Sequence, residues 1–423
     1  MRKRNSRAPL LIITYLLWEL GPFSGITALC QDAPLTLEQC IDIALSENPV
    51  VKSLQDQIQA SLARVNQAKA LSQPSLDIDA DLQPNPFEVW NSGESYVGVS
   101  KSFLFPGKRK VNTAIATHAL NEVSMDSEVL KVNLIYQVKM AFYTMILNEE
   151  HLKYAQQNKD LAQDFLDKTR VMYEAGEVPQ VEVIRAQVEV AKAVNEIEIS
   201  TNELKSSRAD LLFLMGNDKN SELRITGELY EPPVQLDLEY LKDRALLNRV
   251  EIKKMRISME KELLVKKQAK LTYLPDFDLG FSRHTIIGES KTYDMTLALP
   301  IPLFFTQPVR GGIAEAEANY SSYENELKNI QNSIILEVDN AYHLAITAQT
   351  MIDLFDKEML QQTEQVYQML LFSYQEGEIS GIDLIEARKT LINTRQSYGD
   401  ALFNYVIAVA SLERSIGQSL EME

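Results

Sequence analysis

The stretch Tyr173-Glu-Ala-Gly176-Glu-Val-Pro179 returns later in the chain as Tyr374-Gln-Glu-Gly377-Glu-Ile-Ser380. The two copies lie 201 residues apart, and this offset persists along the chain except for a one-residue slip near Ala141 and Ala341. Self-similarity at a fixed offset indicates a duplicated structural unit, and about 200 residues is too long for the repeat of a solenoid. The chain is therefore predicted to contain two similar halves, residues 31–230 and 231–423, after an N-terminal segment at 1–30.

The N-terminal segment 1–30 has the order of a secretory signal peptide: Arg2-Lys-Arg4, then an apolar run, then small residues near Ala28. We expect cleavage after Cys30, and a lipid anchor on Cys30 is the alternative. The formal net charge of −17 makes nucleic acid a poor partner, because an acidic chain repels phosphate. With Cys30 removed, Cys40 is the remaining cysteine, so a disulfide framework is not expected.

Two long helical hairpins are predicted, at about 108–214 and 309–416. No strong helix breaker occurs between Lys108 and Tyr173, and the corresponding stretch 309–374 contains only a glycine pair near its start, so each is expected to form one unbroken helix. The returning helices, at about 181–214 and 382–416, repeat apolar or small residues every three or four positions, which indicates a left-handed coiled coil. Gly176 and Gly377 suit the left-handed residue that ends a helix.

The lengths of the remaining helices predict how they stack. The returning helices are little more than half as long as their partners, and the segments 49–73 and 250–273 have about the missing length. We expect each of these segments to continue the line of a returning helix, with residues 217–236 forming an irregular belt around the junction.

Four strands are predicted, at about 75–83, 95–104, 276–283 and 292–299. In the first, Leu76 and Ile78 alternate with Asp77 and Asp79, which is typical of membrane-barrel strands and also of half-exposed hairpins in soluble proteins. Four strands cannot enclose a lumen, whereas three copies would supply twelve. A membrane-crossing sheet therefore requires a homotrimer. The acidic residues on the polar strand phase are candidate lumen acids: Asp77, Asp79, Asp81, Asp278 and Asp294.

These features together resemble the TolC family of trimeric outer-membrane efflux channels. The resemblance rests on the duplication, on the Leu-Thr-Leu-Glu38 segment and on the Tyr-x-x-Gly tips. It implies a mainly α fold with a β-barrel portion, in which a twelve-stranded outer-membrane barrel continues into a twelve-helix periplasmic α-barrel. The run Phe105-Pro-Gly-Lys-Arg109 is similar to the heavy-metal efflux branch.

The resemblance also implies the function and the partners. The chain would be the passive outer-membrane channel of a tripartite efflux system in a Gram-negative bacterium, extending into the periplasm. Its partners would be two further copies of itself, outer-membrane lipid, a periplasmic adaptor protein and an inner-membrane pump of the resistance–nodulation–division type. A periplasmic adaptor and a coiled-coil scaffold are the two other classes of function that remain open.

The family supplies candidate site residues at the hairpin tips. Asp383 and Glu386 match its acidic ring at the periplasmic constriction, while Glu182 and Tyr374 match a latch between coiled coils. The arginine of that latch is replaced by Ile379. The alternative interpretation is that Asp383 and Glu386 only favour the start of a helix. Adaptor docking is expected at the two tips: Ala175, Gly176, Glu177 and Val178, with Glu376, Gly377, Glu378 and Ile379.

An enzymatic function is not expected from the sequence. The four histidines are isolated, and none has the partner spacing of a zinc site. The sequence also lacks a phosphate-binding glycine-rich loop. We therefore expect neither a cofactor nor a metal site, and we look for function in constrictions and docking surfaces.

Overall fold

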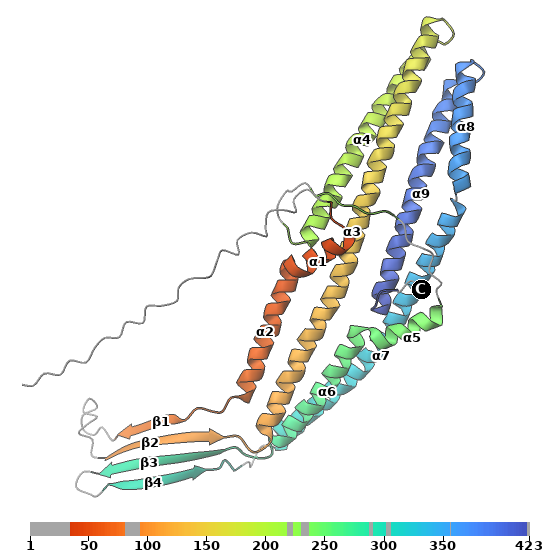
Figure 1. Cartoon of the computed structure of the whole chain (residues 1–423). Helices are drawn as coiled ribbons and strands as arrows, with labels where there is room; N and C mark the ends of the chain where they lie inside the picture. Colours follow the sequence, from red (N-terminus) through yellow and green to blue (C-terminus); the bar gives the residue numbers. More distant parts are fainter. Residues whose placement is uncertain are drawn as a thin grey trace, which may run out of the picture.

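The computed structural model describes residues 34–80, 94–217, 223–229, 237–286, 291–301, 306–355 and 357–420. The predicted signal peptide at 1–30, the predicted boundary near residue 230 and the candidate lumen residue Asp81 lie outside these ranges. The molecule is elongated, with a small sheet at one end and two hairpin tips at the other (Figure 1).

The first hairpin consists of helix α3 (Lys108–Glu174) and helix α4 (Gln180–Leu214). Helix α3 has 67 residues, which corresponds to about 100 Å at 1.5 Å per residue. It follows Gly107, whose backbone is in the left-handed region at φ 99°. Because no glycine or proline follows until the tip, the hydrogen-bond ladder of α3 continues over its whole length.

The structure of the second hairpin contradicts the prediction that residues 309–374 form one unbroken helix. The stretch 309–374 is two helices, α7 (Thr306–Leu354) and α8 (Lys357–Gln375), which precede α9 (Gly381–Ile416). At the end of α7 the backbone N–H of Phe355 donates to the carbonyls of both Met351 and Ile352, each at 3.1 Å, which is the tightened geometry of a last helical turn. The glycine pair near the start does not interrupt α7.

Four shorter helices complete the helical part: α1 (Leu37–Glu47), α2 (Pro49–Lys69), α5 (Leu238–Asn248) and α6 (Val250–Leu271). Thr36 and Gln39 form a capping box at the start of α1. Asn48 caps α2 and donates from its side-chain amide to the carbonyl of Leu214 at 2.8 Å. The start of α2 therefore meets the end of α4, as the helix lengths predict.

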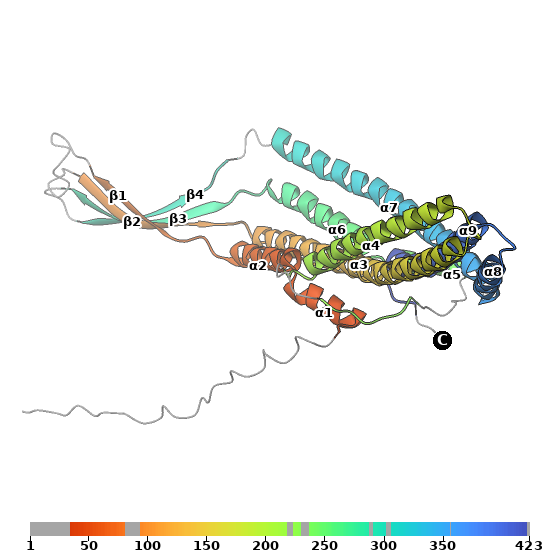
Figure 2. The same ribbon diagram turned by 90° about the horizontal axis from the view of Figure 1, so that it is seen from above.

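The strands form one antiparallel sheet in the order β1 (Ser75–Ala80), β2 (Glu94–Phe103), β3 (Phe277–Ile286) and β4 (Thr292–Ala298). Strands β2 and β3 pair directly although they come from different halves of the chain. Val99 lies opposite Leu76 on one side and Phe281 on the other, so the apolar positions share one face. In the view from above, the sheet extends away from the helices (Figure 2).

A large apolar core lies where α1, α3 and α4 meet, around Phe142, Met145 and Leu211. Cys40 is fully buried in it as a free thiol, and burial raises the pKa of that thiol to about 11. Leu35 donates to the carbonyl of Arg224 and accepts from the N–H of Thr226, both at 2.9 Å. The described part of the predicted belt, residues 223–229, is thereby fixed to the start of α1.

Candidate functional site

Both hairpin tips are tight turns built around a glycine. Gly176 and Gly377 have φ of 80° and 74°, which residues with a side chain rarely adopt. The N–H of the following residue reaches back to the last helical turn, from Glu177 to Met172 and from Glu378 to Ser373, each at 2.9 Å. Added Cβ atoms at the two glycines would meet nothing within 4 Å. The tips are therefore open surfaces.

The other predicted tip residues are divided between surface and core. Ala175, Glu177, Glu376 and Glu378 are exposed. Val178 and Ile379 are half-buried and pack against an apolar cluster directly beneath the tips. That cluster contains residues of both hairpins, so the two tips are supported by one core.

Tyr374 is the main contact between the hairpins in this core. Its side chain is 2 % exposed, and its ring centroid lies 5.3 Å from that of Phe165 on α3. The hydroxyl of Thr169 donates to the carbonyl of Phe165 at 2.7 Å, so the phenol of Tyr374 donates to Thr169 Oγ1 at 2.9 Å. Burial raises the pKa of Tyr374, and the charge of Glu182 raises it further.

Glu182 lies next to this contact, at the start of α4. Its Oε1 accepts a hydrogen bond from Arg185 Nη1 at 2.7 Å, while its buried Oε2 has no hydrogen-bond partner among the described residues. A Cβ at Gly381 would come within 2.7 Å of that Oε2 and 3.2 Å of the Phe165 ring. Gly381 thus lets the start of α9 approach α4 closely, and Glu182 and Tyr374 are brought together.

Asp383 and Glu386 have a different setting, on the exposed side of α9. Asp383 completes a capping box with Ser380, whose hydroxyl donates to Oδ2 at 2.7 Å. Glu386 pairs with Lys389 at 3.3 Å. Both carboxylates line a shallow groove between α8 and α9, together with Thr363 and Ile379.

The sequence analysis missed a buried ion pair between the hairpins. Arg388 on α9 donates to Glu189 on α4 at 2.7 Å, and the two side chains are 3 % and 9 % exposed. Arg388 also donates to the side-chain oxygen of Asn158 on α3 at 2.7 Å. The opposite charges occur where the two halves do not repeat each other, because the repeat counterparts are Gln187 and Thr390. A comparison of the two halves at these positions could therefore have singled out Arg388 and Glu189 from the sequence.

Burial alone would raise the pKa of Glu189, but the hydrogen bond from Lys192 and the charge of Arg388 outweigh burial and lower it. The carboxylate is therefore charged at neutral pH. Arg395 makes a further but more exposed contact between the hairpins, because it donates to Gln157 on α3 at 2.8 Å and to Glu364 on α8. Polar contacts between the two hairpins thus occur at Tyr374, then at Arg388 and then at Arg395, at increasing distance from the tips.

The described lumen candidates share one face of the sheet. The register places Asp77 in one row with Gly98, Ser282 and Asp294, and it places Asp79 opposite Tyr96. Asp278 lies four residues before Ser282 on β3, so its side chain has the same phase. Sequence analysis did not include Glu94 and His284, whose Oε1 and Nε2 atoms lie 2.6 Å apart on this face.

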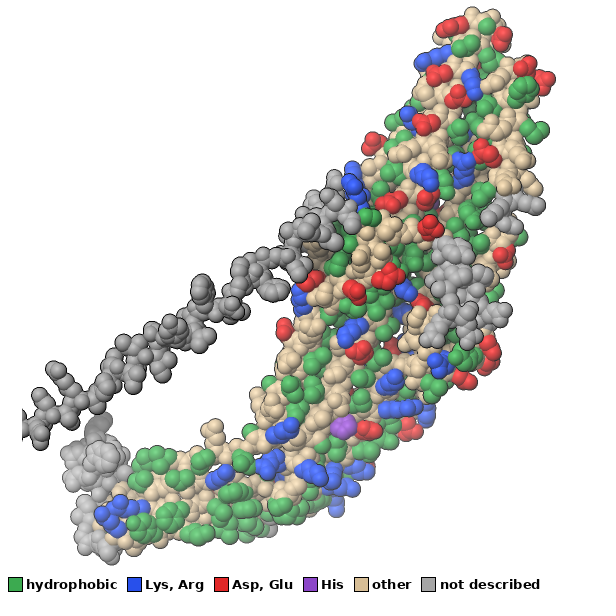
Figure 3. Space-filling model, in the orientation of Figure 1, with side chains coloured by type: hydrophobic (Ala, Val, Ile, Leu, Met, Phe, Trp, Pro, Cys, Tyr) green, Lys and Arg blue, Asp and Glu red, His purple; other side chains and the backbone are tan. Residues whose placement is uncertain are grey.

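The opposite face of the sheet is apolar and exposed. Leu76, Ile78, Phe281 and Met295 have 59–78 % of their surface accessible. Figure 3 shows hydrophobic side chains gathered over the sheet, whereas acidic and basic side chains are scattered among hydrophobic ones over the helical part. The sheet therefore separates a polar face from a face suited to lipid.

Comparison with known proteins agrees with this geometry. The sequence model of the outer membrane efflux protein family matches residues 40–217 and again 241–418. The chain belongs to the outer membrane efflux protein family. The two matched segments are offset by 201 residues, which is the offset of the internal repeat.

The relatives agree with this assignment along most of the chain. The cobalt-zinc-cadmium resistance protein CzcC of Cupriavidus metallidurans is 21% identical over 389 residues, which cover 91% of this chain and 90% of CzcC. The outer membrane protein TolC of Escherichia coli is 22% identical, with 95% and 85% covered. The CmeC outer membrane channel of Campylobacter jejuni has a TM-score of 0.76 at 15% identity, covering 97% of this chain and 94% of CmeC.

The family assignment confirms the predicted fold class, function and location. The protein is an outer-membrane efflux protein with a periplasmic extension, and proteins of this family work with an adaptor and an inner-membrane pump. The alternatives of an adaptor and a scaffold are thereby set aside. Members of the family are channels, and within the described ranges no three His, Cys, Asp or Glu side chains are grouped as metal ligands.

No helix in the described ranges combines the length and the apolar character that a membrane crossing needs.

Proposed function

We propose that three copies of this chain form one efflux duct whose resting constriction is built by Asp383 and Glu386. One observation carries the proposal: the exposed apolar sheet face lies at one end of the molecule and the two open tips lie at the other (Figure 1). Joining the free edge of β4 to the free edge of β1 of the next copy would give twelve strands around one lumen.

The proposed gate uses the position of the two carboxylates. Asp383 and Glu386 are exposed on the first turns of α9 and lack a buried partner. In three copies around one axis, six carboxylates would repel one another and attract cations. In the proposed closed state, the buried contacts of Tyr374 and Arg388 would hold the second hairpin against the first. Dilation would then require α8 and α9 to shift on α3 and α4.

The gate is tested by single-channel recording. Asp383 is the third residue of α9, and its carboxylate accepts a hydrogen bond from the backbone N–H of Ser380. Asp383→Asn is therefore the better substitution, because the amide oxygen of asparagine can still accept that bond. The variant Asp383→Asn/Glu386→Gln should conduct more than the parent and lose block by multivalent cations added at the tip end. A matched control, Glu196→Gln/Glu198→Gln, removes the same charge from α4 away from the tips. Equal conductance and equal block in the gate variant and the parent would place the gate elsewhere.

The tips are the proposed adaptor-docking surface. Gly176 and Gly377 have open space where a side chain would lie, so a bulky residue would stand directly on the surface. Gly176→Leu and Gly377→Leu should abolish efflux while the trimer still forms. Glu174→Leu, on an exposed residue just before the first tip, is the control for added apolar surface. Unchanged efflux in both glycine variants would exclude docking at the tips.

The proposed cargo is cationic, and the proposed pump is of the resistance–nodulation–division type. The described lumen acids share one face, and the similar protein CzcC is named for cobalt, zinc and cadmium resistance. A passage lined with carboxylates concentrates cations. Deleting the gene should increase sensitivity to one of these metal ions. If the deletion instead increases sensitivity to organic drugs and leaves sensitivity to metal ions unchanged, the exported compound is a drug and not a metal ion.

A further inference from the structure

Basic residues are concentrated where the sheet meets the helices. The chain passes this boundary four times, and the segments beside it are 66–76, 99–113, 264–276 and 306–314. Together these segments contain nine Lys or Arg residues and one acidic residue, Asp276, although the whole chain has a net charge of −17. Figure 3 shows basic side chains gathered at this boundary, in the view that also shows hydrophobic side chains over the sheet.

Most of these cations lack an acidic partner. Lys108 is paired with Asp276 at 2.9 Å, and Lys266 is paired with Glu317 at 2.9 Å. Six others are exposed and make no hydrogen bond or ion pair within the described ranges. These six residues form what we call the basic collar: Lys69, Arg109, Lys110, Lys267, Lys270 and Arg310. Like charges so close together repel one another unless an anion lies among them.

The dipoles of the helices explain only part of the collar. Lys69 and Lys270 lie in the last turns of α2 and α6, where a positive charge is favourable. Arg109 and Lys110 lie in the first turn of α3, where a positive charge is unfavourable and where no acidic residue occurs. These two cations therefore do not stabilise α3, and their partner has to be sought outside the chain.

The start of α3 is held in place by Asp276, which precedes β3. Its Oδ1 accepts a hydrogen bond from the backbone N–H of Phe105 at 2.7 Å and one from Lys108 Nζ at 2.9 Å. Arg109 and Lys110 follow directly after this contact. The collar is thus attached to a turn that both halves of the chain fix together.

Lys101 shows where the collar lies relative to a membrane. It occupies a position on the apolar face of β2, in one row with Leu279 and Leu297 of the neighbouring strands. Its ammonium group lies 5.4 Å from the centre of the Phe103 ring, which is two residues nearer to the helices. A lysine on a lipid-facing surface extends its charge toward the nearest head groups. The head groups are therefore expected at the end of β2, beside the collar.

We propose that the basic collar binds anionic phospholipids of the periplasmic leaflet through their phosphate groups. The apolar face of the sheet would contact the acyl chains of these lipids, and the collar continues that surface at the level of the phosphates. Cations without a partner favour lipids with a net negative charge over zwitterionic ones. Lipids of the outer leaflet are out of reach, because the collar lies at the end of the sheet that joins the periplasmic helices (Figure 1). The inference depends on neither the proposed gate nor the proposed cargo.

The lipid preference of the full-length protein tests this proposal. The protein is reconstituted into phosphatidylcholine bilayers with a trace of spin-labelled phosphatidylglycerol or spin-labelled phosphatidylcholine, and the fraction of each label that the protein immobilises is compared. At low salt, phosphatidylglycerol should be preferred about fivefold, the factor that one Lys or Arg near an anionic surface contributes. The ratio should fall toward one in about 1 M NaCl, where the screening length is only about 3 Å.

Substitutions in the collar locate the preference. Arg109→Gln/Lys110→Gln/Arg310→Gln should bring the ratio close to one, because it removes three cations and leaves no acidic partner unpaired. Arg109→Glu/Lys110→Glu should invert the ratio, so that phosphatidylcholine is preferred. All three residues are exposed, and size in mild detergent checks that each variant assembles as the parent does.

A matched control removes the same charge elsewhere. Lys153→Gln/Arg170→Gln/Lys205→Gln changes exposed residues of α3 and α4 far from the sheet, and it should keep the preference of the parent. A ratio near one in the parent at low salt overturns the proposal. An equal loss in the collar variant and in this control also overturns it, because the preference then follows net charge alone.

Inorganic phosphate separates a lipid surface from a site for the free ion. At equal ionic strength, phosphate should reduce the preference for phosphatidylglycerol no more than chloride does. A loss that is specific to phosphate would contradict the lipid assignment, because the collar would then bind the free anion.

Discussion

Removing the carboxylate of Glu189 is expected to free the start of α9 from α4. The guanidinium of Arg388 is 3 % exposed, and after Glu189→Leu it would retain only Asn158 as a polar partner. Breaking a buried ion pair by removing one partner costs about 3–5 kcal/mol. Lys192 also loses its partner, but its side chain is 64% exposed and can be hydrated. Most of the cost therefore comes from the isolated Arg388.

Amide hydrogen exchange along α9 measures this cost. At about 1.4 kcal/mol per factor of ten, a cost of about 3–5 kcal/mol predicts that amides between Leu384 and Arg395 exchange roughly 10²- to 4 × 10³-fold faster than in the parent. Adding Arg388→Met should restore most of the protection, because an apolar replacement of both partners is about neutral. Glu386→Leu is the control, since that carboxylate is exposed. Exchange within threefold of the parent in Glu189→Leu would refute the argument.

Three further predictions concern other parts of the molecule. The pKa of Glu189 is lowered in the fold, so the stabilising effect of its carboxylate is complete above the ordinary pKa of 4.5 and is lost as the pH falls through the folded pKa. The melting temperature of the trimer should therefore drop in this acidic range, and the drop should be smaller in Glu189→Gln. An equal drop in the parent and in Glu189→Gln would contradict this cause. Asp77→Asn/Asp294→Asn should reduce cation-over-anion selectivity, measured as a reversal potential at low salt, and an unchanged potential would exclude these acids as its source. Gly216→Ala should lower the melting temperature more than Gly176→Ala does. Both glycines have positive φ, but only at Gly216 would the added Cβ lie 2.7 Å from a backbone oxygen, the carbonyl of Glu47. Equal losses of melting temperature in the two variants would contradict this prediction.

The fold was predictable because its signals are local and repeated. The glycines at the tips, the alternation along β1 and the three- and four-residue spacing of α4 each follow from backbone geometry within a few residues. The end of α7 at Leu354 was not predictable in this way. The sequence there, Ile352-Asp-Leu-Phe-Asp356, contains neither glycine nor proline, so no local rule marks an interruption.

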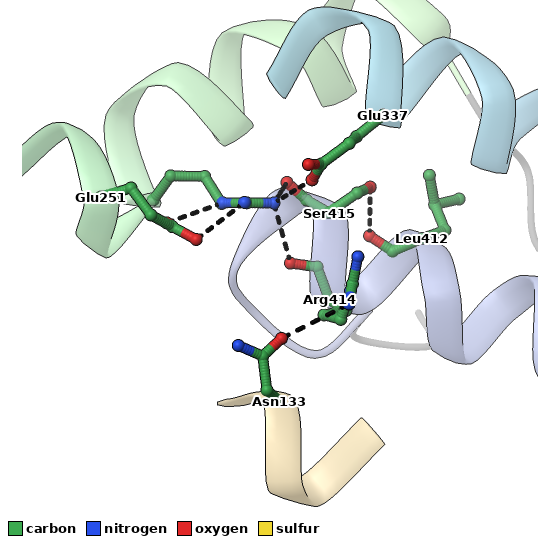
Figure 4. Close-up of polar contacts among 7 residues, drawn as sticks. Asn133, Glu251, Glu337, Leu412, Arg414 and Ser415 are labelled. Carbon is green, nitrogen blue, oxygen red and sulfur yellow. Dashed lines mark hydrogen bonds and ion pairs between the residues drawn. The ribbon is translucent and has the colours of Figure 1, made fainter. Parts of the chain in front are cut away.

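The site was predictable only in part, because its contacts join distant segments. Tyr374 and Glu182 were paired through the resemblance to the TolC family, and not from the residues of this chain alone. The pairing of Arg388 with Glu189 depends on how the two hairpins are rotated against each other, which the spacing within one helix does not determine. In the same way, Asn48 and Arg249 occupy equivalent junctions and donate to the equivalent carbonyls of Leu214 and Ser415, although their side chains differ. Only the three-dimensional contacts, drawn for the second junction in Figure 4, show this equivalence.

The interruption between α7 and α8 makes the two hairpins mechanically unequal. A continuous helix such as α3 resists bending along its whole length, because every turn is tied to the next by hydrogen bonds. The second hairpin spans a similar length with two helices, α7 and α8, so its hydrogen-bond ladder consists of two separate runs. We therefore expect the arm formed by α3 and α4 to resist bending more than the arm formed by α7, α8 and α9.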